Sequence, residues 1–106
     1  MKIDKYEQLT LDLQHAGKTA AMLFGDSEDG GTCNLDAITM TLPHWNTNKV
    51  KTAAEAAGMS AWKSSGYFVI NPRTSGQANR RTRICGAIKK ELKSKGYDVG
   101  MFYMVD

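Results

Sequence analysis

Apolar residues recur every three or four positions in three stretches of the chain, which is the spacing of one face of an α-helix. The first stretch is residues 4–16, the second begins at Asn46 or Thr47 as its N-terminal cap, and the third follows an arginine-rich segment. Each stretch is closed by a glycine, the residue that most often ends a helix. These glycines are Gly17, Gly58 and Gly96. The pattern therefore predicts three helices.

Five shorter apolar runs have the length and composition of β-strands. They cover residues 19–24, 32–42, 59–63, 67–71 and 101–105. A polar, glycine-rich connection joins the first run to the second, and a Ser-Ser-Gly connection joins the third to the fourth. Each of these pairs is predicted to form a hairpin. The predicted order of elements is α-ββ-α-ββ-α-β.

This order favours a single α+β domain, residues 1–106, built as a two-layer sandwich in which a mostly antiparallel sheet packs against helices. The segment from Tyr67 to Val105 is a C-terminal β-α-β crossover, which is expected to be right-handed and to set its two strands parallel. A chain of 106 residues can bury one core but has no room for a separate catalytic subdomain.

Basic charge is concentrated in the C-terminal part of the chain. The formal net charge is +3, but residues 1–62 hold five lysines and eight acids, whereas residues 63–106 hold nine lysines or arginines and three acids. Such a field attracts anionic partners. No apolar stretch approaches the roughly 18 residues of a membrane span, and the first residues lack the apolar core of a signal peptide. We therefore expect a cytoplasmic protein without membrane contact.

All four arginines lie within residues 73–83, between the apolar run 67–71 and the third helix. Backbone N–H groups at a helix start have no intrahelical partners, and guanidinium groups fork onto phosphate oxygens. The sequence therefore predicts an anion site in which Arg80 and Arg81 grip a phosphate. Neighbouring residues would add hydrogen bonds from backbone and side chains: Arg73, Ser75, Gly76, Gln77 and Asn79. Tyr67 or Trp62 would stack on a base.

Arg81 projects onto the apolar stripe of the third helix, which runs from Ile84 to Leu92. Three lysines fall on the opposite side: Lys89, Lys90 and Lys93. A charge on a buried face needs a partner, because an unpaired one costs several kcal/mol. Three interpretations stay open at this point. Arg81 pairs with an internal acid such as Asp36 or Asp98, extends its charged end past the edge of the core, or binds a ligand.

The sequence carries no signature of a nucleotide-binding fold, no catalytic triad and no metal-ligand spacing. His15 and His44 stand apart from other ligand-type residues and are interpreted as surface or turn residues. Cys33 and Cys85 match no zinc or redox spacing and are interpreted as packing residues, with a disulfide as the alternative. We therefore predict binding without turnover, with no catalytic residue, metal or cofactor.

Two weaker patterns have simpler interpretations. The acidic segment 26–30 has the wrong ligand spacing for a calcium loop and is interpreted as a hairpin turn. Residues 53–60 look like the start of a helix-turn-helix motif. The segment that would follow as recognition helix soon meets Ser64-Ser65-Gly66, which leaves too little helix to enter a DNA groove.

Three pieces of the chain resemble small uncharacterised proteins carried by phages and prophages of low-GC Gram-positive bacteria. They are DGGTCNLD at residues 29–36, SGQANRRTR at residues 75–83 and FYMVD at residues 102–106. The resemblance implies a phage setting, and hence the host cytoplasm as compartment. Small phage proteins without enzymatic motifs are often antagonists of host defence.

Together these features predict a non-enzymatic binder of a phosphate-bearing small molecule or nucleotide, as an anti-defence protein that sequesters a nucleotide immune signal. One alternative is an inhibitor of a host nuclease such as a CRISPR effector, an anti-CRISPR protein whose partner is a host defence protein. The other is a small DNA- or RNA-binding protein. Association with a second copy of the chain is a further option.

Overall fold

The computed structural model describes residues 3–24, 37–72 and 78–102, and of Phe24 and residues 78–81 it describes the backbone only. Seven elements follow one another along the chain: α1 (Lys5–Phe24), β1 (Ala37–Thr41), α2 (Thr47–Ala56), β2 (Ser60–Ser64), β3 (Tyr67–Asn71), α3 (Ala78–Ser94) and β4 (Asp98–Phe102). Cys33, the acidic segment 26–30 and residues 103–105 lie outside the described residues. None of the described helices is both long and apolar enough to cross a bilayer.

The four strands form one sheet in the order β2-β3-β1-β4, and every neighbouring pair is antiparallel. Because β3 and β4 are both antiparallel to β1, they are parallel to each other, and the predicted C-terminal crossover is present with β1 between its two strands. In the same way, β1 and β2 are parallel to each other, are connected through α2, and have β3 between them. Two such interlocked units make the split β-α-β arrangement of ferredoxin-like folds. The predicted two-layer α+β class is confirmed.

One element was predicted wrongly. Residues 19–24 do not form a strand, since α1 continues from Lys5 through Gly17 to Phe24. Gly17 does not end the helix because it is a packing position: a Cβ built there would lie 3.1 Å from Met59 Cε. Close packing at Gly17 and the burial of Ala16 and Ala20 on the same helix offset the low helix propensity of glycine. The order of elements is therefore α-β-α-ββ-α-β.

The predicted ends of the other helices are confirmed in detail. Asn46 caps α2, and its Oδ1 accepts a hydrogen bond from the backbone N–H of Lys49 over 3.0 Å. Gly58 follows the helix with φ +79°, and the next N–H bonds back to the carbonyl of Ala54 over 2.8 Å. Gly96, with φ +94°, closes α3 in the same way. This is the Schellman geometry, which glycine adopts without strain.

The short hairpin between β2 and β3 is also confirmed, with Ser65 and Gly66 as its two-residue turn. The last strand begins earlier in the chain than predicted, at Asp98 instead of Met101. Tyr97 and Asp98 are polar enough to read as a loop, but pairing with β1 brings Asp98 opposite Thr41. The start of a strand is thus set by its neighbour in the sheet.

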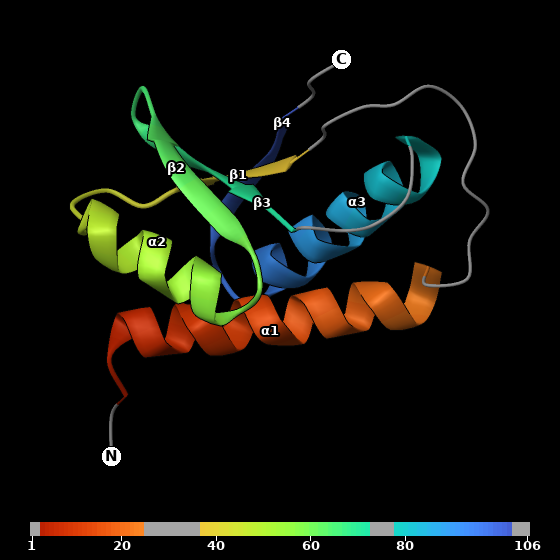
Figure 1. The fold of residues 1–106 in the computed structure, drawn as a ribbon, viewed down its shortest axis with the longest axis horizontal. Coiled ribbons are helices and arrows are strands. Elements are labelled where there is room, and N and C mark those ends of the chain that lie inside the picture. The colour runs from red at the N-terminus through yellow and green to blue at the C-terminus, as the bar shows by residue number, and fades with distance from the viewer. Residues whose placement is uncertain (1–2, 25–36, 73–77, 103–106) are drawn as a thin grey trace.

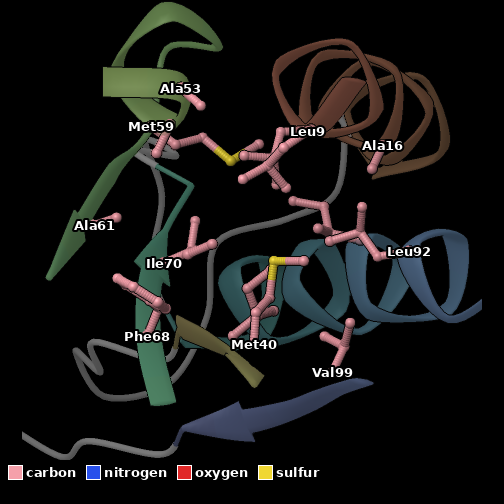
Figure 2. Packing of buried hydrophobic residues seen from close by; sticks show 14 of the residues in the cluster. Leu9, Ala16, Met40, Ala53, Met59, Ala61, Phe68, Ile70, Leu92 and Val99 are labelled. Atoms are coloured by element: carbon pink, nitrogen blue, oxygen red, sulfur yellow. The ribbon is translucent and has the colours of Figure 1, made fainter. Parts of the chain in front are cut away.

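All three helices lie on one side of the sheet, and α1 packs against both α2 and α3 (Figure 1). Alternate strand residues point toward the helices and close a single core, as Figure 2 shows for Ile70 and Met40 with Leu9 of α1. The side chains of this core that are fully buried and largest include Phe68, Leu13, Ile38, Ile88 and Leu92. Burial of apolar surface on this scale supplies the main driving force of folding.

Candidate functional site

The predicted anion site has the backbone elements that the sequence indicated. Strand β3 precedes the arginine segment and α3 begins at Ala78, so Asn79, Arg80 and Arg81 fall in its first turn. The structure does not describe the side chains of these three residues. Four further predicted site residues lie entirely outside the described ranges: Arg73, Ser75, Gly76 and Gln77. The contacts of the predicted site therefore stay a prediction.

The faces of α3 agree with the predicted wheel. Ile84, Ile88 and Leu92 are buried against the rest of the core, and Cys85 is buried beside them. Lys90 and Lys93 are exposed, and Lys89 is half-buried. The basic side of α3 therefore faces away from the core.

Trp62 and Tyr67 lie on the sheet face opposite to Phe68 and Ile70, whose side chains are part of the core under the helices. Trp62 on β2 pairs with Val69, and Tyr67 pairs with Ser64, so the two aromatic residues occupy diagonal positions on the same face. Trp62 is 40% exposed and Tyr67 is half-buried. Two accessible aromatic rings on one sheet face are a platform on which bases can stack.

The sheet separates this platform from the start of α3. Tyr67 begins β3 and Asn71 ends it, so at about 3.4 Å per residue Tyr67 lies roughly 14 Å from the end that leads to the arginine segment. Trp62, opposite Val69, is about half as far from that end. Both rings point to the face opposite the helix layer that contains α3. The structure thus does not bring Tyr67 together with the arginine end of the predicted site.

A cleft of about 690 Å³ lies at the end of β3, and we call it the β3-end cleft. Pro72 lines it and directly precedes the arginine segment. Its other walls come from α1 and from the turn between α2 and β2: Leu11, Gln14, His15, Gly17, Lys18, Ala57, Gly58 and Met59. The lining is mixed, with Leu11, Met59 and Pro72 as apolar residues and Gln14, His15 and Lys18 as polar ones. The sequence could not reveal this cleft, because its walls come from three separate segments.

His15 at the edge of this cleft is exposed, and its Nε2 lies 3.1 Å from Glu91 Oε1 on α3. His44 is exposed in the turn after β1. The interpretation of both histidines as surface or turn residues is therefore confirmed. Only His15 is placed where it could also donate to a ligand.

A buried polar cluster that the sequence did not single out centres on Asp12. This residue of α1 is 6% exposed, and its two carboxylate oxygens accept hydrogen bonds from Tyr97 Oη, over 2.6 Å, and Gln8 Nε2, over 2.9 Å. Lys95 Nζ lies 3.9 Å from Asp12 Oδ1. Burial, the hydrogen bond to Asp12 and the charge of Asp12 together raise the pKa of Tyr97 far above its usual value.

Side chains from α1 and from the end of α3 thus converge on the Asp12 carboxylate and hold it in place. The cluster lines a second large hollow, of about 670 Å³, whose wall includes Trp45. Lys5 lines the same hollow, and its Nζ lies 4.7 Å from the centroid of the Trp45 ring. Sequence alone gave no signal for the cluster, since Asp12 and Tyr97 are 85 positions apart.

The described residues contain no group of three or more His, Cys, Asp or Glu side chains arranged to hold a metal ion. The helix-turn-helix pattern is not realised, because residues 60–64 form strand β2 instead of a recognition helix. Comparison with protein-family models, with curated proteins and with solved structures gave no match.

Proposed function

We propose that the protein binds a phosphate-bearing nucleotide without converting it. The observation that carries the proposal is that Pro72 lines the β3-end cleft. The arginine segment begins directly after Pro72 and continues into α3. The base would rest against Leu11 and Met59 in the cleft, with Gln14 and His15 as hydrogen-bond partners. The phosphates would then reach Arg80 and Arg81 in the first turn of α3, where the helix dipole also favours negative charge.

Charge supports this arrangement. Helix α3 carries six arginines and lysines and one acid, Glu91, which lies against His15. Lys18 adds a further cation to the wall of the cleft. An anionic ligand would therefore enter a positive field from either side of the cleft. The resemblance to phage and prophage proteins implies the biological role we propose, sequestration of a nucleotide immune signal of the host.

Titration calorimetry against cyclic dinucleotides, ADP-ribose and ATP tests the proposal. A charge-assisted contact contributes about 1.5–3 kcal/mol, so R81Q should weaken binding by roughly 10- to 100-fold. K51Q removes the same charge from the exposed side of α2 and should change affinity less than twofold. Equal effects of the two variants, or no binding of any nucleotide in the panel, would contradict the proposal.

Recovery of the bound ligand tests the second half of the proposal. After heat denaturation, the nucleotide should return intact and in a stoichiometric amount. A hydrolysed product in excess of the protein would show that the protein is an enzyme.

A second candidate function, binding of single-stranded nucleic acid, is favoured by the accessible rings of Trp62 and Tyr67 on one sheet face. RNA-recognition domains use a four-stranded sheet with exposed aromatic residues for this purpose. W62A should then weaken the binding of an oligonucleotide more than the binding of a mononucleotide. Inhibition of a host nuclease such as a CRISPR effector remains the other alternative, and capture of that nuclease by the tagged protein in infected cells would support it.

A further inference from the structure

Strand β2 forms one edge of the sheet, because the strand order is β2-β3-β1-β4. A two-residue turn joins it to β3, so Ser64 and Tyr67 on either side of the turn form a hydrogen-bonded pair. Hydrogen-bonded and non-hydrogen-bonded pairs alternate along antiparallel strands. Ala61 and Lys63 are therefore in non-hydrogen-bonded pairs, and their backbone N–H and C=O groups point outward from the sheet. No hydrogen bond from another described residue reaches these outward groups.

No feature of β2 itself blocks the approach of another strand. Edge strands are commonly protected by short length, by proline or by a charged side chain at the edge. Strand β2 has five residues, as do the three other strands, and it contains no proline. Its one charged residue is Lys63, whose Nζ lies 5.8 Å from the centroid of the Phe68 ring. Because Phe68 is opposite Lys63 on β3, the ammonium group is turned inward over the neighbouring strand.

The residues of β2 are arranged almost symmetrically about Trp62, as Ser-Ala-Trp-Lys-Ser. We propose that β2 pairs antiparallel with β2 of a second copy of the chain, around a two-fold axis at Trp62. The outward groups of Ala61 then bond to those of Lys63 in the other copy, and the axis repeats this pair. Ser60 lies opposite Ser64 in the same register. The two sheets thereby become one continuous antiparallel sheet.

Trp62 supplies the apolar contact of this interface. The residue is 40% exposed, although it is one of the largest hydrophobic residues of the chain. On the two-fold axis the two tryptophans form a non-hydrogen-bonded pair, in which the Cα atoms are about 4.5 Å apart and the side chains are closest. Ser60 and Ser64 flank Trp62 on the same face, so no bulky side chain of β2 separates the two rings. Aromatic pairs of this kind stabilise a sheet beyond the area that they bury.

Charge favours β2 over the other edge strand, β4, for pairing between two copies. Lys89 and Lys90 of α3 line a hollow together with Met101 of β4, and a two-fold axis at β4 would bring these lysines toward their counterparts. At β2, Lys63 lies opposite the uncharged Ala61 of the second copy, so like charges do not meet. An unrelated peptide would offer the same backbone bonds but not the matched positions, because a self-complementary edge is the property of a two-fold contact.

Sedimentation equilibrium of the full chain without nucleotide tests the interface independently of the proposed function. Because a single strand pair is a small interface, the wild type should form a dimer that dissociates on dilution. K63P removes an outward N–H that makes no bond to β3, and it should weaken dimerisation at least tenfold. K63A removes the same side chain but keeps the N–H, and it should change the dissociation constant less than threefold. Equal constants for the two variants, or a wild type that stays monomeric at about 1 mM, would overturn the proposal.

Disulfide cross-linking tests the register without changing the backbone. W62C places two thiols across the axis, within the range of a disulfide, and should give a covalent dimer under mild oxidation. K63C is the matched control, because position 63 lies opposite Ala61 of the other copy. Its two thiols would be carried by Cα atoms about 8 Å apart, which is beyond that range. Peptide mapping distinguishes the introduced link from links through the native cysteines. Equal cross-linking of W62C and K63C, or none with either, would overturn the proposed register.

Discussion

Tyr97 donates a hydrogen bond from its hydroxyl to Asp12 Oδ2 over 2.6 Å and so ties α1 to the turn between α3 and β4. The bond joins residues near opposite ends of the chain. Gln8 occupies the other oxygen of the same carboxylate. Because α1 adds a third helix to the split β-α-β core, this contact is one of the few polar links that fix its position.

We expect Y97F to lower the free energy of unfolding by about 1–3 kcal/mol, since it leaves the buried carboxylate of Asp12 with one donor fewer. Urea denaturation followed by circular dichroism measures the change. Y67F removes a hydroxyl that makes no hydrogen bond within the described chain and should change stability by less than about 0.5 kcal/mol. A Y97F protein as stable as Y67F would mean that the Asp12 contact contributes nothing.

The same hydrogen bond predicts a dependence of stability on alkaline pH. The pKa of Tyr97 is raised in the folded protein above the ordinary tyrosine value of about 10. The protonated hydroxyl therefore stabilises the fold fully below pH 10, and this contribution is lost as pH rises toward the folded-state pKa. The difference in Tm between the wild type and Y97F should be constant from pH 7 to 9 and should shrink above pH 10. A constant difference up to pH 11.5 would contradict the assignment.

Gly100 and Thr39 are opposite one another in the β1–β4 pair, and they predict a steric effect. A Cβ on Gly100 would lie 2.8 Å from Thr39 Oγ1, which is too close for an ordinary contact. G100A should therefore destabilise the protein by about 1–3 kcal/mol. In a T39A background the obstructing oxygen is gone, and the same substitution should have less than half that effect. Additive effects in the double-mutant cycle would show that the strain lies elsewhere.

The N-terminal cap of α2 gives a local prediction. N46A removes the oxygen that accepts from the N–H of Lys49 and should lower stability by about 1 kcal/mol. Asn48 lies two residues further on, exposed in the first turn of α2, where alanine is a better helix former than asparagine. N48A is therefore the matched control. That variant should be neutral or slightly stabilising in the same urea experiment. The cap would be ruled out as a stabilising contact if both variants behaved alike.

Local chemistry in the sequence determined much of the fold. The cap at Asn46, the glycines that close α2 and α3, the Ser65-Gly66 turn and the stripe from Ile84 to Leu92 each depend on residues within a few positions of one another. Such signals act before any tertiary contact forms, so they can be read from the sequence. The α+β class follows from them, even with one strand too many.

Tertiary packing decided the rest. Gly17 would end an isolated helix, but contact with Met59 makes it an interior residue of α1, so residues 19–24 became helix instead of strand. Tyr97 as a partner of Asp12 and the walls of the β3-end cleft come from segments that are distant in sequence. The charge pattern of the sequence predicts that anions are attracted, and it predicts their site near Arg80 and Arg81. Which side chains share a hollow depends on strand order and helix packing, and only the tertiary structure sets those.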